Sequence, residues 1–206
     1  QVTADVIEVA DRLRIIGRAG VGVDNVDVPA ATQRGVLVVN SPEGNTIAAA
    51  EHALALLLSL SRHVPQAHAS MRAGSWDRKK YVGNELYKKV LGVVGLGKIG
   101  SHVAKVAKAM GMEVIAFDPF ISADRAQQMQ VRLTTLEDLF RQADYITLHI
   151  PRTPDTENLV NAELLRTMKS TARIVNCARG GIVDEAAIAE AIDNGLFIGE
   201  EPVDER

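Results

Sequence analysis

The sequence is poor in cysteine and in aromatic residues, with one cysteine, Cys177, and 4% Phe, Trp and Tyr among 206 residues. One thiol cannot form a disulfide within the chain, so a disulfide-stapled domain is excluded, and we interpret Cys177 as a small buried side chain. Long apolar runs are also missing. The longest, Ile47–Leu60, is interrupted by Glu51 and His52 and is shorter than the roughly 18 residues of a membrane span.

A basic excess is absent as well, since 23 Lys and Arg stand against 26 Asp and Glu, for a net charge of −3. A nucleic-acid surface would show clustered basic residues, so we expect no nucleic-acid partner. The first twenty residues lack the basic start and apolar run of a signal peptide. We therefore expect a cytoplasmic protein without membrane contact, long enough for one large or two small domains.

Short apolar runs alternate with helical patterns along most of the chain. Such alternation predicts parallel strands joined by right-handed helical crossovers, and hence an α/β fold with a doubly wound (Rossmann) parallel sheet. The expected strands lie at 13–20, 35–40, 89–97, 113–119, 144–151 and 172–178. The expected helices lie at 98–111, 122–130, 136–143, 161–169 and 184–195.

A further helix is expected from Asn45 to His63, and it is apolar nearly all round. A helix of this kind is buried on most faces, by other domains or by a second subunit. A polar helix follows Pro65, and residues 73–86 break the pattern as a loop.

The stretch "VLGVVGLGKIG" places Gly95, Gly97 and Gly100 between a strand and a helix. The first glycine of such a motif makes a tight turn, the second lets the backbone approach a pyrophosphate, and the third lets helix and strand pack closely. The helix that begins near Lys98 directs its free N–H groups at the phosphates. Asp118 ends the next strand, 18 residues past Gly100, where a carboxylate accepts hydrogen bonds from the ribose hydroxyls.

The alternative is a structural glycine turn with Asp118 as an ordinary turn residue, but the coincidence of strand, glycines and acid favours a dinucleotide site. A carboxylate repels a 2′-phosphate, and none of the next residues, "PFIS", is basic. We therefore expect NAD rather than NADP.

Arg179 stands at the tip of a buried strand, within "NCARGGIVDE". Ligands of open α/β sheets bind at the carboxyl ends of the strands, so Arg179 is expected on the same edge as the glycine motif. Its forked guanidinium suits the carboxylate of a substrate. A salt bridge to Asp184 or Glu185 is an equally good explanation.

Several stretches together resemble one family: "GRAGVGVDNVD", "NSPEGNTIAAAEHALALLLSLSR", "VLGVVGLGKIG", "FDPF", "LHIPRTPDTENLVN" and "VNCARGGIVDEAAIAEAI". They are similar to the D-isomer-specific 2-hydroxyacid dehydrogenases. The forms "CARGGIVDE" and "WDRKKYVGNEL" favour the branch that acts on 3-phosphoglycerate. The resemblance implies hydride transfer between NAD and C2 of 3-phosphoglycerate or 3-phosphohydroxypyruvate, the first step of serine biosynthesis.

Two alternatives stay open: another NAD-dependent D-2-hydroxyacid dehydrogenase, or a non-catalytic NAD(H)-sensing protein like the co-repressor relatives. A glyoxylate or hydroxypyruvate reductase fits less well, because Asp118 opposes its usual NADP preference.

The resemblance also implies roles for single residues. Arg179 holds the substrate carboxylate, and Glu201 pairs with a histidine that acts as general acid and base from a "PHxG" motif. None of His52, His63, His68, His102 and His149 stands in such a motif, so we expect this polypeptide to bind NAD but to turn over poorly or not at all. The remaining cofactor contacts implied by the family are Val21, Lys98, Ile99, Ile150, Pro151, Cys177, Ala178 and Arg179.

A substrate phosphate requires cations, and we hypothesise that Arg18 and Arg78 supply them, with Asn45 also assigned to the substrate site. The alternative for "DRKK", which contains Arg78, is a solvated loop. No metal is expected.

The family pattern further implies three segments and an assembly. Residues 1–42 would be the end of a flavodoxin-like substrate-binding domain, 43–199 the NAD-binding domain and 200–206 a return segment. A strand expected between Gly199 and Glu200 is missing, so we predict a segment there that the sequence omits. The helix Asn45–His63 would join a homodimer or homotetramer, with Leu54, Leu57 and Leu58 at or near the interface.

Overall fold

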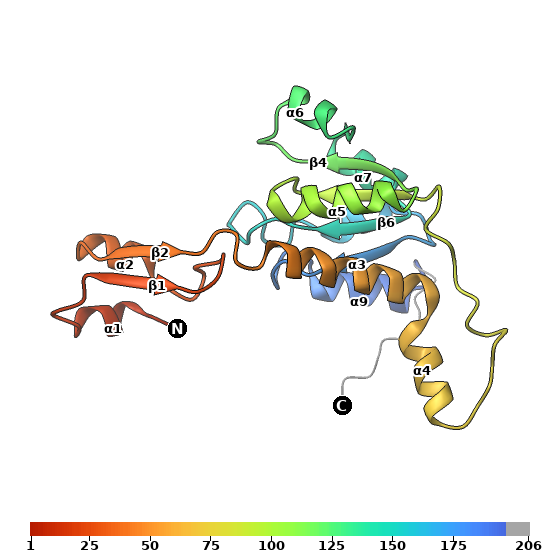
Figure 1. Ribbon diagram of the computed structural model, residues 1–206, viewed down its shortest axis with the longest axis horizontal. Coiled ribbons are helices and arrows are strands. Elements are labelled where there is room, and N and C mark those ends of the chain that lie inside the picture. Colours follow the sequence, from red (N-terminus) through yellow and green to blue (C-terminus); the bar gives the residue numbers. More distant parts are fainter. Residues whose placement is uncertain (197–206) are drawn as a thin grey trace. The chain divides into compact units, whose positions relative to one another are not determined.

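The computed structural model describes residues 1–196, so the expectations for Glu201 and for the Gly199–Glu200 junction lie outside the described residues. The chain divides into two compact units, Gln1–Ala48 and the part from Ala49 onward. Each unit has a parallel sheet of its own (Figure 1).

The first unit pairs two parallel strands, β1 and β2, in the register Ile15 opposite Leu37. Both strands were predicted, whereas the two short helices of this unit were not. Asp27 begins the second helix, because its carboxylate accepts a hydrogen bond from the Ala30 N–H at 2.9 Å, a normal N-cap arrangement. The elements are α1 (Ala4–Glu8), β1 (Ile15–Arg18), α2 (Val28–Gln33) and β2 (Leu37–Asn40).

The second unit is built on five parallel strands in the order β5-β4-β3-β6-β7. This order reverses direction at the central strand β3, which confirms the doubly wound sheet that the alternation predicted. The strands are β3 (Val90–Val94), β4 (Glu113–Phe117), β5 (Arg132–Leu133), β6 (Tyr145–Leu148) and β7 (Arg173–Asn176).

Asp144 fixes the beginning of the central strands. Its carboxylate accepts a hydrogen bond from the Val90 N–H at 2.8 Å and from Lys169 Nζ at 2.8 Å. Burial alone would raise the pKa of Asp144, but these two donors outweigh it and lower the pKa. The pair therefore ties β3, β6 and the segment before β7 together at one end of the sheet.

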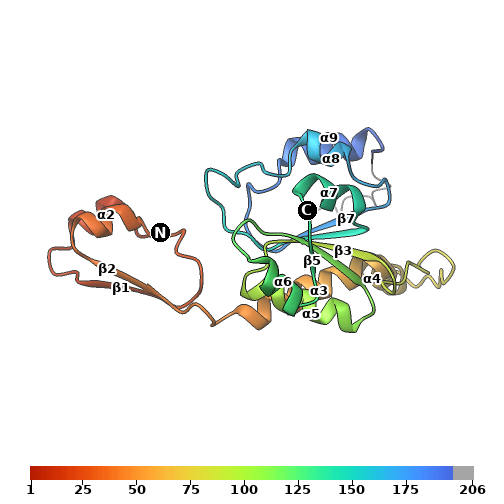
Figure 2. The ribbon, with the colours of Figure 1, turned by 90° about the horizontal axis from the view of Figure 1, so that it is seen from above.

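Helices cover both faces of the sheet (Figure 2). Successive side chains of a strand point to opposite faces, and in β3 Val93 packs among residues of α3 and α5, whereas Val94 packs among residues of α7, α8 and α9. The helices are α3 (Thr46–Arg62), α5 (Lys98–Ala109), α6 (Ala123–Gln128), α7 (Leu136–Gln142), α8 (Ala162–Arg166) and α9 (Glu185–Asp193).

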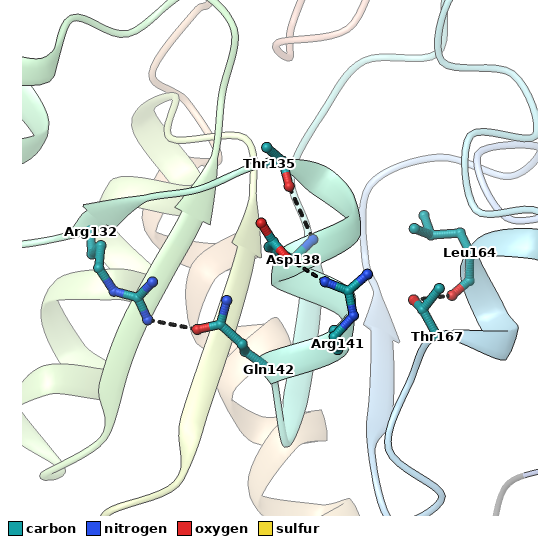
Figure 3. Close-up of polar contacts among 7 residues, drawn as sticks. All are labelled: Arg132, Thr135, Asp138, Arg141, Gln142, Leu164 and Thr167. Carbon is teal, nitrogen blue, oxygen red and sulfur yellow. Dashed lines mark hydrogen bonds and ion pairs between the residues drawn. The ribbon is translucent and has the colours of Figure 1, made fainter.

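Polar contacts hold α7 and its neighbours in place (Figure 3). The Thr135 hydroxyl caps α7 by accepting from the Asp138 N–H at 3.1 Å, and Asp138 forms an ion pair with Arg141. Arg132 on β5 donates to the Gln142 side chain at 2.9 Å, which joins the short edge strand to the helix. The chain following α8 is held in the same way, since the Thr167 hydroxyl donates to the Leu164 carbonyl at 2.7 Å.

Helix α3 matches the predicted helix to within one residue at each end, but its faces differ from the expectation. Leu54 and Leu57 are 8% and 1% exposed because they pack into the core of the second unit itself. Leu58 and Leu56 remain 41% and 39% exposed. Leu54 and Leu57 therefore pack within their own unit, and their position at or near an interface between subunits stays a prediction.

The polar helix after α3 is α4 (Val64–Arg72), separated from it by His63 in a left-handed conformation with φ of 52°. The segment between Arg72 and Val90 contains no helix or strand, as the sequence predicted. No helix among residues 1–196 has the length and apolar character needed to cross a membrane.

Candidate functional site

The glycine motif forms the turn between β3 and α5. Gly95 has φ of +93°, which a side chain rarely tolerates, and an added Cβ would lie 2.7 Å from the His149 carbonyl oxygen. At Gly100 an added Cβ would lie 1.9 Å from the Gly95 carbonyl oxygen, so α5 packs onto the turn only because Gly100 has no side chain. An added Cβ at Gly97 would meet nothing within 4 Å, so the backbone there borders open space.

The backbone of Leu96, inside this turn, is held from both sides by side chains. Its N–H donates to Asp118 Oδ2 at 2.7 Å, and its carbonyl accepts from the Ser101 hydroxyl at 2.7 Å. The other Asp118 oxygen accepts from the Phe120 N–H at 2.8 Å. A carboxylate has about four acceptor positions, so Asp118 anchors the loop and still has positions for a ligand hydroxyl.

Asp118 and the glycine turn share a pocket of about 440 Å³. A cradle of exposed N–H groups, glycines without side chains and a carboxylate fits the pyrophosphate and ribose of a dinucleotide. The lining includes Gly97, Lys98 and Asp118, which were predicted, and Phe120, Ser122 and Arg125, which were not. Arg125 lies seven residues after Asp118 and reaches the pocket because α6 returns the chain to it, so the residues directly after Asp118 do not reveal this contact.

The end of β6 lies against the glycine turn. An added Cβ at Gly95 would lie 2.7 Å from Ile150 Cγ2, so Ile150 adjoins the motif, and Pro151 follows it. His149 is largely buried, which lowers its pKa to about 4. Its Nε2 lies 2.9 Å from the Thr147 hydroxyl. An imidazole that stays neutral at pH 7 and hydrogen-bonds within the sheet suits a structural role better than proton transfer.

The loop after β7 is shaped by Asn176. Its side chain accepts from the Ala178 N–H and donates to the Arg179 carbonyl, both at 3.0 Å. Arg179 is exposed rather than buried, and its Nη1 donates to the Ala178 carbonyl at 2.7 Å. Cys177 is half-buried, and burial raises the pKa of its thiol, so the thiol stays protonated near neutral pH.

Asp184, one of the two carboxylates in the alternative explanation of Arg179, has a structural role, and its other acceptor positions leave that alternative open. Its carboxylate caps α9 by accepting from the Ala187 N–H at 3.0 Å. Arg179 thus projects from the carboxyl end of β7, on the edge of the sheet that also presents the glycine turn and Ile150.

The remaining predicted residues do not belong to the strands or loops that form this edge of the sheet. Arg18, Val21 and Asn45 belong to the first unit, where the Asn40 side chain donates to the Val21 carbonyl at 2.7 Å. Arg78 is exposed in the loop after α4, which is compatible with both the phosphate contact and the solvated loop. No group of His, Cys, Asp and Glu within residues 1–196 is arranged to hold a metal ion.

Residues 54–199 match the model of the "D-isomer specific 2-hydroxyacid dehydrogenase, NAD binding domain". The chain belongs to this family. The resemblance seen in the motifs is therefore confirmed, and NAD is the cofactor of the domain. The glycine turn, the Asp118 carboxylate and the pocket that they share fit that cofactor.

Relatives of the chain are longer than the chain itself. It is 62% identical to a D-3-phosphoglycerate dehydrogenase of Synechocystis over 97% of its own length and 36% of the relative. It is 50% identical to the enzyme of the same name from Bacillus subtilis, over 97% of this chain and 38% of the relative. A D-lactate dehydrogenase from Aquifex aeolicus, solved with NAD and lactic acid, superposes with a TM-score of 0.86 at 31% identity, covering 95% of this chain and 59% of the other. The chain thus spans little more than a third of the two sequence relatives.

Proposed function

We propose that the protein containing this chain is an NAD-dependent D-3-phosphoglycerate dehydrogenase. The observation that supports this most is the 62% identity to the Synechocystis enzyme of that name, which extends over 97% of the chain. The site is consistent with the proposal, because a dinucleotide pocket and an exposed arginine occur on one edge of the sheet. The enzyme would stand at the entry to serine biosynthesis.

In this proposal the chain contributes binding and orientation. Asp118 accepts hydrogen bonds from the adenosine ribose, and the N–H groups at the start of α5 face the pyrophosphate. NAD, when bound, supplies the hydride acceptor for C2 of the substrate. Arg179 holds the substrate carboxylate through two parallel charge-assisted hydrogen bonds, which fixes C2 relative to the loop after β7.

The two residues before Arg179, Cys177 and Ala178, add no charge of their own. The Cys177 thiol is neutral because its pKa is raised, and Ala178 contributes only backbone and a methyl group. The proton of the C2 hydroxyl is assigned to a histidine outside this sequence, paired with Glu201.

The direct test is an assay of the full-length protein with NAD and a panel of D-2-hydroxy acids. We expect the highest kcat/KM for 3-phosphoglycerate, and Arg179→Ala should lower it by about 10- to 100-fold through the loss of charge-assisted hydrogen bonds. Arg179→Lys should restore only part of the activity, because an ammonium group cannot form the fork. Arg141, which is exposed on α7 in an ion pair with Asp138, is the matched control. A preference for an unphosphorylated acid, or full activity of Arg179→Ala, would contradict the proposal.

In this proposal Arg18 and Arg78 recognise the substrate phosphate, and Asn45, the residue before α3, also belongs to the substrate site. Neutralising both arginines should raise the KM for 3-phosphoglycerate more than the KM for D-lactate. An equal change for the two substrates would remove the arginines from the phosphate site.

We further propose that the protein assembles through exposed residues of α3. Ile47, Leu56 and Leu58 are 50%, 39% and 41% exposed, and Trp76 in the loop after α4 is 75% exposed. Ile47 and Leu58 lie on one side of α3, because eleven residues complete about three turns, and Leu56 lies on the opposite side. Exposed large apolar side chains on a helix commonly mark an interface. Light scattering should give the mass of a dimer or tetramer, and Leu56→Asp with Leu58→Asp should shift it toward the monomer. A wild-type monomer at micromolar concentration would refute the assembly.

A further inference from the structure

The adenosine end of the dinucleotide pocket contains opposite charges. Asp118 is the acidic residue in its lining, and Arg125, from the first turn of α6, belongs to the same lining. The backbone N–H of Arg125 donates to the Ser122 hydroxyl at 3.3 Å. Within residues 1–196 the Arg125 side chain has no hydrogen-bond or ion-pair partner, so its charge is available to a ligand.

The charge of Asp118 is already partly compensated. Its two oxygens accept the N–H groups of Leu96 and Phe120 at 2.7 and 2.8 Å. Donors to a carboxylate reduce the field that it exerts on a second anion nearby. Repulsion of a 2′-phosphate by Asp118 is therefore weaker than for a carboxylate without partners.

A second, more basic pocket of about 620 Å³ adjoins the first and shares Arg125 with it. Lys105 and Lys108 of α5 line this second pocket, and no acidic residue does. Lys108 Nζ is fixed by hydrogen bonds to the Met129 carbonyl at 2.9 Å and to the Gln130 side chain at 2.7 Å. Arg125 thus stands where the ribose pocket opens toward a cationic surface.

We propose that this chain binds NADP(H) as well as NAD(H), with the Arg125 guanidinium holding the 2′-phosphate. The inference rests on the dinucleotide-binding role of the family domain and extends it to a second cofactor. Asp118 keeps NAD(H) the tighter ligand, and Arg125 determines how much lower the affinity for NADP(H) is. Guanidinium groups suit this task because they bind phosphate oxygens in a fork.

The test is titration of the full-length protein with NADH and NADPH, followed by the fluorescence of the reduced nicotinamide. Arg125→Ala should weaken NADPH binding about tenfold or more, as expected for lost charge-assisted hydrogen bonds, and NADH binding less than about threefold. Arg125→Lys should recover part of the NADPH affinity. Arg141→Ala, which removes an exposed arginine from α7, should change neither.

A second pair of ligands isolates the phosphate. Adenosine 2′,5′-bisphosphate should lose affinity in Arg125→Ala, whereas AMP should not. Equal losses for both dinucleotides, or wild-type binding of NADH without measurable binding of NADPH, would overturn the role of Arg125 and leave NAD binding intact. Failure of the wild type to bind either dinucleotide would overturn the inference together with the proposed function.

Discussion

Replacing Asp118 by alanine tests the glycine turn most directly, because this carboxylate serves both the loop and the ligand. In the variant the Leu96 N–H loses its acceptor, and Leu96 is only 2% exposed, so water cannot replace it easily. An unsatisfied buried donor costs about 1–3 kcal/mol. The Phe120 N–H also loses its acceptor, but Phe120 is 95% exposed and water takes over there. We therefore expect a local loss of about 1–3 kcal/mol centred on Leu96.

Two measurements separate the loop from the ligand. Hydrogen exchange of the peptide around Leu96, without cofactor, should be about 5- to 150-fold faster in the variant, because each 1.4 kcal/mol is a factor of ten. NADH affinity should fall by at least as much, since the ribose also loses its acceptor. Asp138→Ala is the control, because Asp138 lies in an exposed ion pair with Arg141 on α7. Unchanged exchange at Leu96 would refute the anchoring role, and unchanged affinity would refute the ribose contact.

Three further predictions concern single contacts. Gly100→Ala should abolish dinucleotide binding and lower the melting temperature, because its Cβ would lie 1.9 Å from the Gly95 carbonyl oxygen. Gly97→Ala should weaken dinucleotide binding and leave the melting temperature unchanged, and a larger loss of melting temperature in Gly97→Ala than in Gly100→Ala would contradict this. The pKa of His149 is about 4 in the folded protein against 6.5 for a free imidazole, so between these pH values the unfolded state binds more protons. The free energy of unfolding should therefore fall by up to about 3 kcal/mol as pH drops from 6.5 to 4. In urea unfolding, His149→Gln should show a weaker dependence of this free energy on pH, and a dependence identical to that of the wild type would disprove the assignment. The pKa of Asp144 is lowered in the folded protein, so the stability that this carboxylate contributes is present above its ordinary pKa and is lost as pH falls through the folded value. Asp144→Ala at pH 7 should lower the free energy of unfolding by about 1–3 kcal/mol and speed hydrogen exchange at the Val90 amide. An unaltered exchange rate would show that the contact is dispensable.

The parts of the fold that sequence predicted are those whose signals are local. Strands β3, β4, β6 and β7 are apolar runs that end in turn residues. The spacing of the glycines in the motif predicts the tight turn between β3 and α5. Strand β5 has only two residues, Arg132 and Leu133, which is too short for any periodicity to reveal.

The faces of α3 and the reach of α6 were not predictable in the same way. Since α3 is apolar nearly all round, its pattern does not say that Leu54 and Leu57 face the core while Leu58 stays exposed. Arg125 enters the dinucleotide pocket because a turn and a helix bring back a residue seven positions after Asp118. Such a return depends on the three-dimensional path of the chain.

The backbone of Leu96, whose N–H is held by a carboxylate and whose carbonyl is held by a hydroxyl, is preorganised for its ligand. The N–H groups of the turn are aimed before any dinucleotide arrives, so binding loses little conformational entropy at this point. Encounter should then be limited by diffusion and charge rather than by a rearrangement of the loop. A rigid entrance of this kind suits a cofactor that must enter and leave in every catalytic cycle.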